Sequence, residues 1–384
     1  MMYAMIFLGV VSFALSLILT PLFRSLGLRL HIVDEPDHHR KIHKVPIPRI
    51  GGVGIVASAI GAYVLLLVVG LNGGGVVRAG EPFAVRLLPA IAVVFGVGLI
   101  DDIFGVRPII KLAAQTLAAV LAWETGIHLS AVGGHDLPAI VGFLLTTIWI
   151  VACSNAINLI DGVDGLATGV GVIAVVTTLM AALLHHNIGL ALATIPLAGA
   201  LLGFLRFNFS PASIFLGDCG SLTLGFLLGC YGVVWSEKSA TVLGMIAPLF
   251  VVFVPLFDTG IAIVRRFVGQ RPIFAADREH IHHKLLAQGL PPGRVVLVLY
   301  GCCGLTCVAS LLLTASRMQY RGLIVASSVV MAALLSLRYL GYTEFTIRDQ
   351  GEPQTESLVR LLNAQFGLMK FEQGLSASET LEDT

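Results

Sequence analysis

Long apolar stretches recur along the chain, separated by short clusters of polar residues. A helix needs about 20 apolar residues to cross the hydrocarbon core of a bilayer, and stretches near that length follow one another along the sequence. The pattern predicts about eleven transmembrane helices. The expected spans are 4–23, 51–71, 86–100, 109–125, 138–156, 165–184, 188–204, 221–235, 242–264, 295–314 and 322–340.

Composition agrees with an all-α polytopic membrane protein. Hydrophobic residues make up 56% of the chain and charged residues 12%, about half of the ~25% that is typical of a soluble domain. Soluble classes are thereby excluded, and a net charge of +1 gives no sign of nucleic-acid binding. The six cysteines lie in or beside apolar spans and are expected to be small buried hydrophobic residues. Residues 1–341 are expected to form the membrane domain, followed by a polar cytoplasmic tail, 342–384.

Lysine and arginine are distributed unevenly between alternate loops. Arg24–Arg49 and Arg265–Arg294 hold six basic residues each, whereas Gly126–Leu137 and His185–Asn187 hold none. Basic loops tend to stay in the cytoplasm. The distribution therefore predicts an outer N-terminus and an inner C-terminus, which requires an odd number of helices.

Polar clusters fall only on the side of the membrane predicted to be cytoplasmic. Five polar clusters on one side of the membrane, each at the end of an apolar span, predict one composite active site that opens to the cytoplasm. The clusters are Asp34–Arg49, Asp101–Asp102, Asn155–Asp164, Phe215–Asp218 and Asp277–His283.

Three carboxylates are candidates for metal binding and catalysis. Asp101 and Asp102 end an apolar span and repel one another unless a cation lies near them. One of the pair would hold a metal and the other would polarise or deprotonate a substrate oxygen; a helix-end charge pair is the alternative. Lys111 is a candidate phosphate contact. Asp218 follows Gly217, which lets backbone approach a ligand closely, and capping of the next helix is the alternative for this acid.

Asn155, Asn158, Asp161 and Asp164 repeat at intervals of three residues. That spacing places paired side chains on one face if the helix continues. Glycines after both acids favour a break between helices instead, which is tolerated within a membrane where it lines a cavity. For Asp164 alone, capping of the next helix competes with a ligand-binding role.

Basic and imidazole side chains supply candidate phosphate ligands in two loops. Arg278, His280, His282 and His283 lie close together, and they suit either phosphate or zinc. Phosphate is favoured because the segment lacks the His-Glu-x-x-His spacing and has no cysteine nearby.

The first loop contributes Asp34, Arg40 and Lys44 as candidate substrate contacts; its basic residues also serve as an orientation signal or a contact for anionic lipid. Asp258 is an acid within a span and is expected to be structural, paired with Arg265 or Arg266.

The order and form of these motifs resemble one enzyme family. The chain is similar to the polyprenyl-phosphate N-acetylhexosamine-1-phosphate transferases of glycosyltransferase family 4, over roughly residues 1–340. The resemblance rests on Arg40-Lys-x-His-x-x-Pro-x-Pro-Arg-x-Gly-Gly52, Asp101-Asp102, Asn155-x-x-Asn-x-x-Asp-Gly-x-Asp-Gly165, Phe215-Leu-Gly-Asp-x-Gly-Ser221 and Asp277-Arg-x-His-Ile-His-His283. The last motif resembles the form found in the bacterial undecaprenyl-phosphate N-acetylglucosamine branch.

The resemblance implies a reaction and a set of roles. Such enzymes transfer a sugar 1-phosphate, here expected to be GlcNAc-1-phosphate, from a UDP-sugar to polyprenyl phosphate in the bacterial cytoplasmic membrane and release UMP. Mg²⁺, or Mn²⁺ in its place, is the implied cofactor, and a homodimer is compatible with the sequence. By position, Asp218 and Asp102 match the metal site, and Asp101 matches the acid that acts on the lipid phosphate. The uridine site is matched by Asn158, Asp161 and Phe215. The diphosphate contacts are matched by His282 and His283, and the sugar contacts by Arg278 and His280.

Other functions fit the sequence less well. The same chemistry on another UDP-amino sugar or on UDP-MurNAc-pentapeptide is the nearest alternative. CDP-alcohol phosphotransferases share the start Asp161-x-x-Asp-Gly165, but the expected continuation is missing. A polyprenyl-linked carrier or flippase would place its polar groups near the bilayer midplane, whereas the polar clusters here lie at one face.

Overall fold

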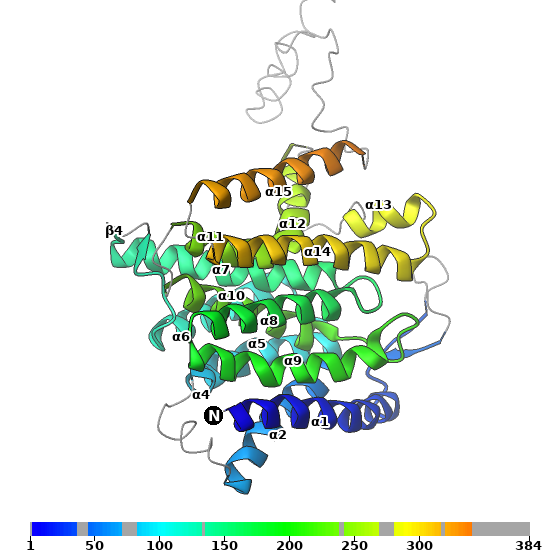
Figure 1. Cartoon of the computed structure of the whole chain (residues 1–384). Coiled ribbons are helices and arrows are strands. Elements are labelled where there is room, and N and C mark those ends of the chain that lie inside the picture. Colours follow the sequence, from blue (N-terminus) through cyan, green and yellow to red (C-terminus); the bar gives the residue numbers. More distant parts are fainter. Residues whose placement is uncertain are drawn as a thin grey trace, which may run out of the picture. The chain divides into compact units, whose positions relative to one another are not determined.

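The computed structural model describes residues 2–36, 45–70, 83–132, 135–237, 242–268, 280–315 and 319–339. These ranges consist almost entirely of helices, most of which lie side by side along a common direction (Figure 1). Residues 1–340 form one compact unit by their contacts. The predicted tail, 342–384, lies outside the described residues. The helices in the first third of the chain are α1 (Met2–Arg29), α2 (Gly51–Val69), α4 (Phe83–Arg86), α5 (Leu88–Phe104) and α6 (Pro108–Glu124).

The rest of the chain continues the helical pattern. Two short antiparallel hairpins are the only strands in the described ranges: β1 (Val33–Asp34) with β2 (Ile47–Pro48), and β3 (Ala131–Val132) with β4 (His135–Asp136). The later helices are α7 (Ala139–Ile160), α8 (Leu166–Leu184), α9 (Ile188–Asn208), α10 (Gly217–Glu237), α11 (Val242–Val251), α12 (Phe253–Val268), α13 (Ile281–Ala287), α14 (Pro292–Ala315) and α15 (Gln319–Tyr339).

Seven helices of the described part are long and apolar enough to cross a membrane: α1, α2, α7, α8, α9, α10 and α14. This confirms the prediction of an all-α polytopic membrane protein. Each of the other expected spans also contains helix, but α5 and α6 have 17 residues each, slightly fewer than the ~20 needed to span without adjustment. The total of eleven spans and the orientation remain predictions.

One expected span, 242–264, is divided in the structure. α11 ends at Val251 and α12 begins at Phe253, and Figure 1 shows α12 running across the direction of its neighbours. Proline has no N–H to donate, and its ring clashes with the carbonyl four residues earlier. Pro255 stands four residues after Val251, so it cannot donate to the Val251 carbonyl, and the helix is interrupted at this point.

α10 lies at the centre of the bundle. It is the most buried of the candidate spans, with 89% of its apolar window enclosed, whereas α1 has 22%. Glycines make this close packing possible: a Cβ on Gly225 would stand 2.5 Å from the carbonyl oxygen of Cys153, and one on Gly98 would stand 2.6 Å from Cys219. Small residues allow membrane helices to approach closely. The first turn of α10 thereby packs closely against α5, and a later turn packs closely against α7.

A short backbone network connects the start of α2 to the start of α10. Phe215 donates its N–H to the Pro48 carbonyl at 2.8 Å, and Gly51 donates to the Phe215 carbonyl at 3.0 Å. The β1–β2 pair holds the ends of the first loop together, with Asp34 opposite Ile47. Segments more than 150 residues apart are therefore joined at the end of the bundle that carries the polar residues.

Candidate active site

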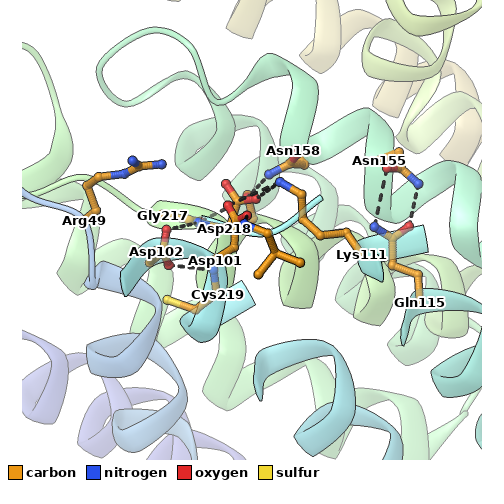
Figure 2. A network of polar contacts seen from close by, with 12 residues as sticks. Arg49, Asp101, Asp102, Lys111, Gln115, Asn155, Asn158, Gly217, Asp218 and Cys219 are labelled. Carbon is orange, nitrogen blue, oxygen red and sulfur yellow. Dashed lines mark hydrogen bonds and ion pairs between the residues drawn. The ribbon is translucent and has the colours of Figure 1, made fainter. Parts of the chain in front are cut away.

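Asp101, Lys111 and Asp218 come together from α5, α6 and α10 (Figure 2). The ammonium nitrogen of Lys111 lies 2.8 Å from one Asp218 oxygen and 3.2 Å from one Asp101 oxygen. The other Asp101 oxygen accepts the Val106 N–H at 2.7 Å, which fixes the carboxylate at the turn after α5. Two acids from different helices thus share one cation.

Asp102 has a different environment from its neighbour. Its two oxygens accept the backbone N–H groups of Asp218 at 2.8 Å and Cys219 at 2.9 Å, and the residue is 7% exposed. The first N–H groups of a helix have no partner within the helix, and a negative charge is favourable there. Asp102 therefore caps α10, and its predicted role in the metal site stays a prediction.

The two asparagines of α7 contact different neighbours. Asn158 donates to the Ser221 hydroxyl at 2.8 Å, which places it against the first turns of α10. Asn155 exchanges hydrogen bonds with Gln115 of α6 and also donates to the Val151 carbonyl. Gln115 and Ser221 were not predicted as members of the site. The signal for Gln115 was an uncharged polar side chain within an apolar span, four residues after Lys111.

Asp161 and Asp164 lie in the turn between α7 and α8. Burial, followed by the charges of Asp218 and Asp102, raises the pKa of Asp161 well above its usual range. Asp164 accepts the Ala212 N–H at 2.9 Å, whereas the N-cap of α8 is Gly165. Asp164 thus links the α7–α8 turn to the loop after α9, and the capping alternative is wrong.

Residues of the first loop reach the same end of the bundle. The Arg49 guanidinium lies 3.7 Å from Asp34, and Figure 2 shows Arg49 beside Asp102 and Gly217. A Cβ on Gly217 would stand 1.9 Å from the Arg49 carbonyl oxygen, and the residue has φ +75°, so glycine is required there. The backbone of Phe215 is hydrogen-bonded to Pro48 and to Gly51, which lie before and after Arg49 in the chain. The predicted contacts Arg40, Lys44 and Arg278 lie outside the described residues.

The histidines are arranged around α13. His280 Nδ1 lies 2.9 Å from a buried Asp258 oxygen, and the other Asp258 oxygen accepts the Ile281 N–H at 2.9 Å. Asp258 of α12 thus holds the start of α13, a pairing across 22 residues that the sequence did not predict. The expected structural role of Asp258 fits this arrangement, and its partners are His280 and Ile281.

His282 faces the turn that carries the acids. The residue is 2% exposed, and its Nε2 has no hydrogen-bond partner among the described residues. A Cβ on Gly162 would stand 3.2 Å from that nitrogen, so the ring lies against the α7–α8 turn. Burial lowers the pKa of His282 to about 3. The His283 ring is adjacent, with centroids 4.2 Å apart.

The residues present fit a magnesium ion that is shared with a phosphate ligand. Mg²⁺ is usually held by one or two carboxylates, several waters and substrate phosphates, without a complete protein cage. The described part of the chain contains no group of three or more His, Cys, Asp or Glu residues arranged for a metal. Asp218 and Asp101 already flank a cation, the Lys111 ammonium, which is the charge arrangement that such a site needs.

Comparison with known proteins identifies the family. Residues 84–236 match the model of glycosyl transferase family 4. A probable undecaprenyl-phosphate N-acetylglucosaminyl 1-phosphate transferase of Bacillus subtilis is 34% identical, covering 76% of this chain and 80% of that protein. A decaprenyl-phosphate N-acetylglucosaminephosphotransferase of Mycobacterium tuberculosis is 36% identical, over 72% and 74%.

A more distant branch is also similar. A phospho-N-acetylmuramoyl-pentapeptide-transferase of Desulforudis audaxviator is 32% identical, over 76% of this chain and 92% of that protein. Similarity of this extent, together with the matching family model and the motifs gathered at one end of the bundle, confirms the resemblance seen in the sequence. The chain belongs to glycosyl transferase family 4.

Proposed function

We propose that this protein transfers GlcNAc-1-phosphate from UDP-GlcNAc to a polyprenyl phosphate. An oxygen of the lipid phosphate attacks the β-phosphorus of the nucleotide sugar, and the bond from that phosphorus to the bridging oxygen breaks. The bridging oxygen leaves with UMP, and the product is a polyprenyl-diphosphate-linked sugar. Relatives named for N-acetylglucosamine transfer at 34% and 36% identity support this choice of sugar.

One observation supports the reaction class above the others. Lys111 and the carboxylates of Asp101 and Asp218 meet at the ends of three apolar helices, at a bundle end where a lipid phosphate and a soluble nucleotide can both arrive. Transfer between two anionic phosphates depends mainly on positioning and charge stabilisation. A carrier or flippase would need its polar site near the bilayer midplane. The polar site here lies at the ends of the helices, which argues against that function.

Each side chain has a proposed task. The Lys111 ammonium is positioned to bind a phosphate oxygen of the ligand by exchanging one of its two carboxylate partners for that oxygen. Asp101, fixed by Val106, would help to position the attacking lipid phosphate through the cation that it holds with Asp218. Asn158, Asp161 and Phe215 bind the uridine, with the Phe215 ring available for stacking. His282 stays neutral because burial lowers its pKa, so it serves as a hydrogen-bond donor to the diphosphate while carrying no charge.

Asp218 and Asp101 would hold Mg²⁺. The ion would supply charge neutralisation between the two phosphates. We further propose that the polar end of the bundle faces the cytoplasm of a bacterial inner membrane, because the basic loops Arg24–Arg49 and Arg265–Arg294 lie on that side of the predicted topology.

Turnover by the purified protein tests the proposal. Detergent-solubilised protein is incubated with Mg²⁺, polyprenyl phosphate and one of three donors: UDP-GlcNAc, UDP-GalNAc or UDP-MurNAc-pentapeptide. UMP release and a new lipid-linked sugar are expected with UDP-GlcNAc, and Asp218→Asn is the matched inactive control. Release with UDP-MurNAc-pentapeptide alone would reassign the donor, and no release with any donor would reject the function.

A further inference from the structure

The turn between α7 and α8 carries Asp161 but belongs to neither helix. Residues 161–165 lie between the end of α7 and the start of α8. Backbone bonds close the turn at its two ends, from Asp161 to the Asn158 carbonyl at 3.2 Å and from Leu166 to the Val163 carbonyl at 3.0 Å. Because no helical ladder runs through the turn, the position of Asp161 depends on the contacts that the turn makes with neighbouring segments.

One of these contacts comes from α14, at Tyr300. The Tyr300 hydroxyl donates to the Gly165 carbonyl at 2.6 Å, across 135 residues of sequence. Gly165 is the N-cap of α8 and has φ +78°, in the left-handed region that favours glycine. Its carbonyl also accepts the N–H of Gly169 at 2.8 Å, and a carbonyl oxygen can accept two hydrogen bonds. The tyrosine thus bonds the residue at which the turn becomes α8.

The packing of α14 against α8 leaves a slot for this side chain (Figure 1). A Cβ on Gly169 would collide with the Tyr300 hydroxyl and with its ring carbon Cζ, so the ring occupies the space that a side chain on α8 would need. On the other side of the bond, a Cβ on Gly165 would stand 3.2 Å from the Phe209 Cα. The hydroxyl and the carbonyl that it bonds are therefore both confined to one position.

Two other tyrosines also donate to backbone carbonyls, but their acceptors differ in kind. The Tyr63 hydroxyl donates to the Leu192 carbonyl at 2.6 Å, and the Tyr231 hydroxyl donates to the Ala193 carbonyl at 3.2 Å. Both acceptors lie within α9, where the helical ladder already fixes the backbone. Such bonds serve the need of a buried phenol for a partner. Tyr300 instead bonds a turn that carries a proposed uridine ligand.

The same turn is held from two further directions. Asp164 accepts the Ala212 N–H at 2.9 Å, and a Cβ on Gly162 would stand 3.2 Å from the Nε2 atom of His282. Asp164 and His282 are themselves candidate substrate contacts, so their removal would change ligand binding directly. Tyr300 is not one of the candidate contacts. Its hydroxyl can therefore be removed to measure what the position of the turn contributes.

We propose that Tyr300 is a positioning residue for the uridine site: its bond to Gly165 holds the α7–α8 turn in the conformation that presents Asp161 to the nucleotide. The inference rests on the proposed function. Without the bond the turn occupies further conformations, and the apparent affinity for the nucleotide falls with the fraction that remains competent to bind. The affinity for polyprenyl phosphate does not change, because its proposed contacts, Lys111 and Asp101, lie on other helices.

Tyr300→Phe tests the assignment because it keeps the ring and removes the donor. The KM for UDP-GlcNAc is expected to rise about three- to tenfold, the range that one ordinary hydrogen bond can account for, while kcat and the KM for polyprenyl phosphate do not change. The affinity for UMP, measured by calorimetry without lipid, should fall by the same factor. Incorporation of p-aminophenylalanine at position 300 restores a donor and should recover part of the affinity.

Tyr63→Phe is the matched control, because it removes a hydrogen bond of the same kind and of equal length, 2.6 Å. It should lower the midpoint of thermal unfolding and leave the KM for UDP-GlcNAc unchanged. An unchanged KM for UDP-GlcNAc in Tyr300→Phe, or an equal rise in both variants, would overturn the proposal. A rise in the KM for both substrates, or loss of cooperative unfolding in Tyr300→Phe, would assign the hydroxyl to stability alone and would also overturn it. Wild-type protein that releases no UMP rejects the proposed function, whereas UMP binding measured by calorimetry still decides the role of Tyr300.

Discussion

Asp102→Ala separates a capping role from a metal-binding role. The substitution leaves the N–H groups of Asp218 and Cys219 without their acceptor, in a place where Cys219 is fully buried. Each unsatisfied buried donor costs about 1–3 kcal/mol, so the loss is expected to be about 2–6 kcal/mol of unfolding free energy. A metal ligand would behave differently, because without metal its removal relieves repulsion between acids.

The assay is thermal unfolding of the purified protein in detergent with EDTA and without substrates. Asp102→Ala should lower the unfolding midpoint clearly in this metal-free buffer, and Asp102→Asn should recover part of the loss because one amide oxygen still accepts. Asp101→Asn is the matched control, since Asp101 accepts only one backbone N–H. An unchanged midpoint for Asp102→Ala, with loss of turnover and of the Mg²⁺ dependence, would refute the capping role.

Three further predictions follow from the same contacts. Lys111→Gln should lower kcat for UMP release by about 10²–10³, the usual effect of losing a preorganised donor; unchanged turnover would exclude a phosphate contact. Asp258→Ala removes the acceptor of His280 and Ile281 and should raise the KM for UDP-GlcNAc, with Asp258→Asn restoring part of it; an equal loss in both would point to folding alone. Because burial lowers the pKa of His282 to about 3, the unfolded chain takes up a proton below about pH 6.5 that the folded protein does not. Stability should therefore fall as pH drops from 6.5 toward 3, by at most about 1.4 kcal/mol per pH unit, and His282→Asn should flatten this slope in pH-dependent thermal unfolding.

Helix positions were largely predictable because the bilayer restricts the choice. A chain in hydrocarbon has to satisfy its own backbone hydrogen bonds, so apolar stretches of sufficient length become helices. The expected spans 51–71 and 188–204 correspond closely to α2 and α9. The span 242–264 was predicted less well, since hydropathy averages over Pro255 and does not register the interruption.

The candidate site was predictable as a set of residues but not as a set of contacts. Polar side chains at one end of apolar spans are visible in the sequence, and Asp101 and Asp218 do meet. Which atoms meet depends on packing between helices far apart in the chain. The bond from Asn155 to Gln115 and the pair of Asp258 with His280 have no periodicity that would reveal them.

The first turn of α10 explains why the adjacent residues Asp101 and Asp102 have different contacts and different proposed roles. A glycine-rich helix start is a natural anion site, since its N–H groups and the helix dipole both favour negative charge. Here Asp102 already occupies two of those N–H groups, so a substrate phosphate cannot use them. The proposed phosphate contacts therefore fall to Lys111 and to a cation that Asp218 and Asp101 would hold. Asp102 thereby occupies the backbone anion site at the start of α10, whereas Asp101, bonded to Val106 and Lys111, belongs to the side chains proposed to act on the substrates.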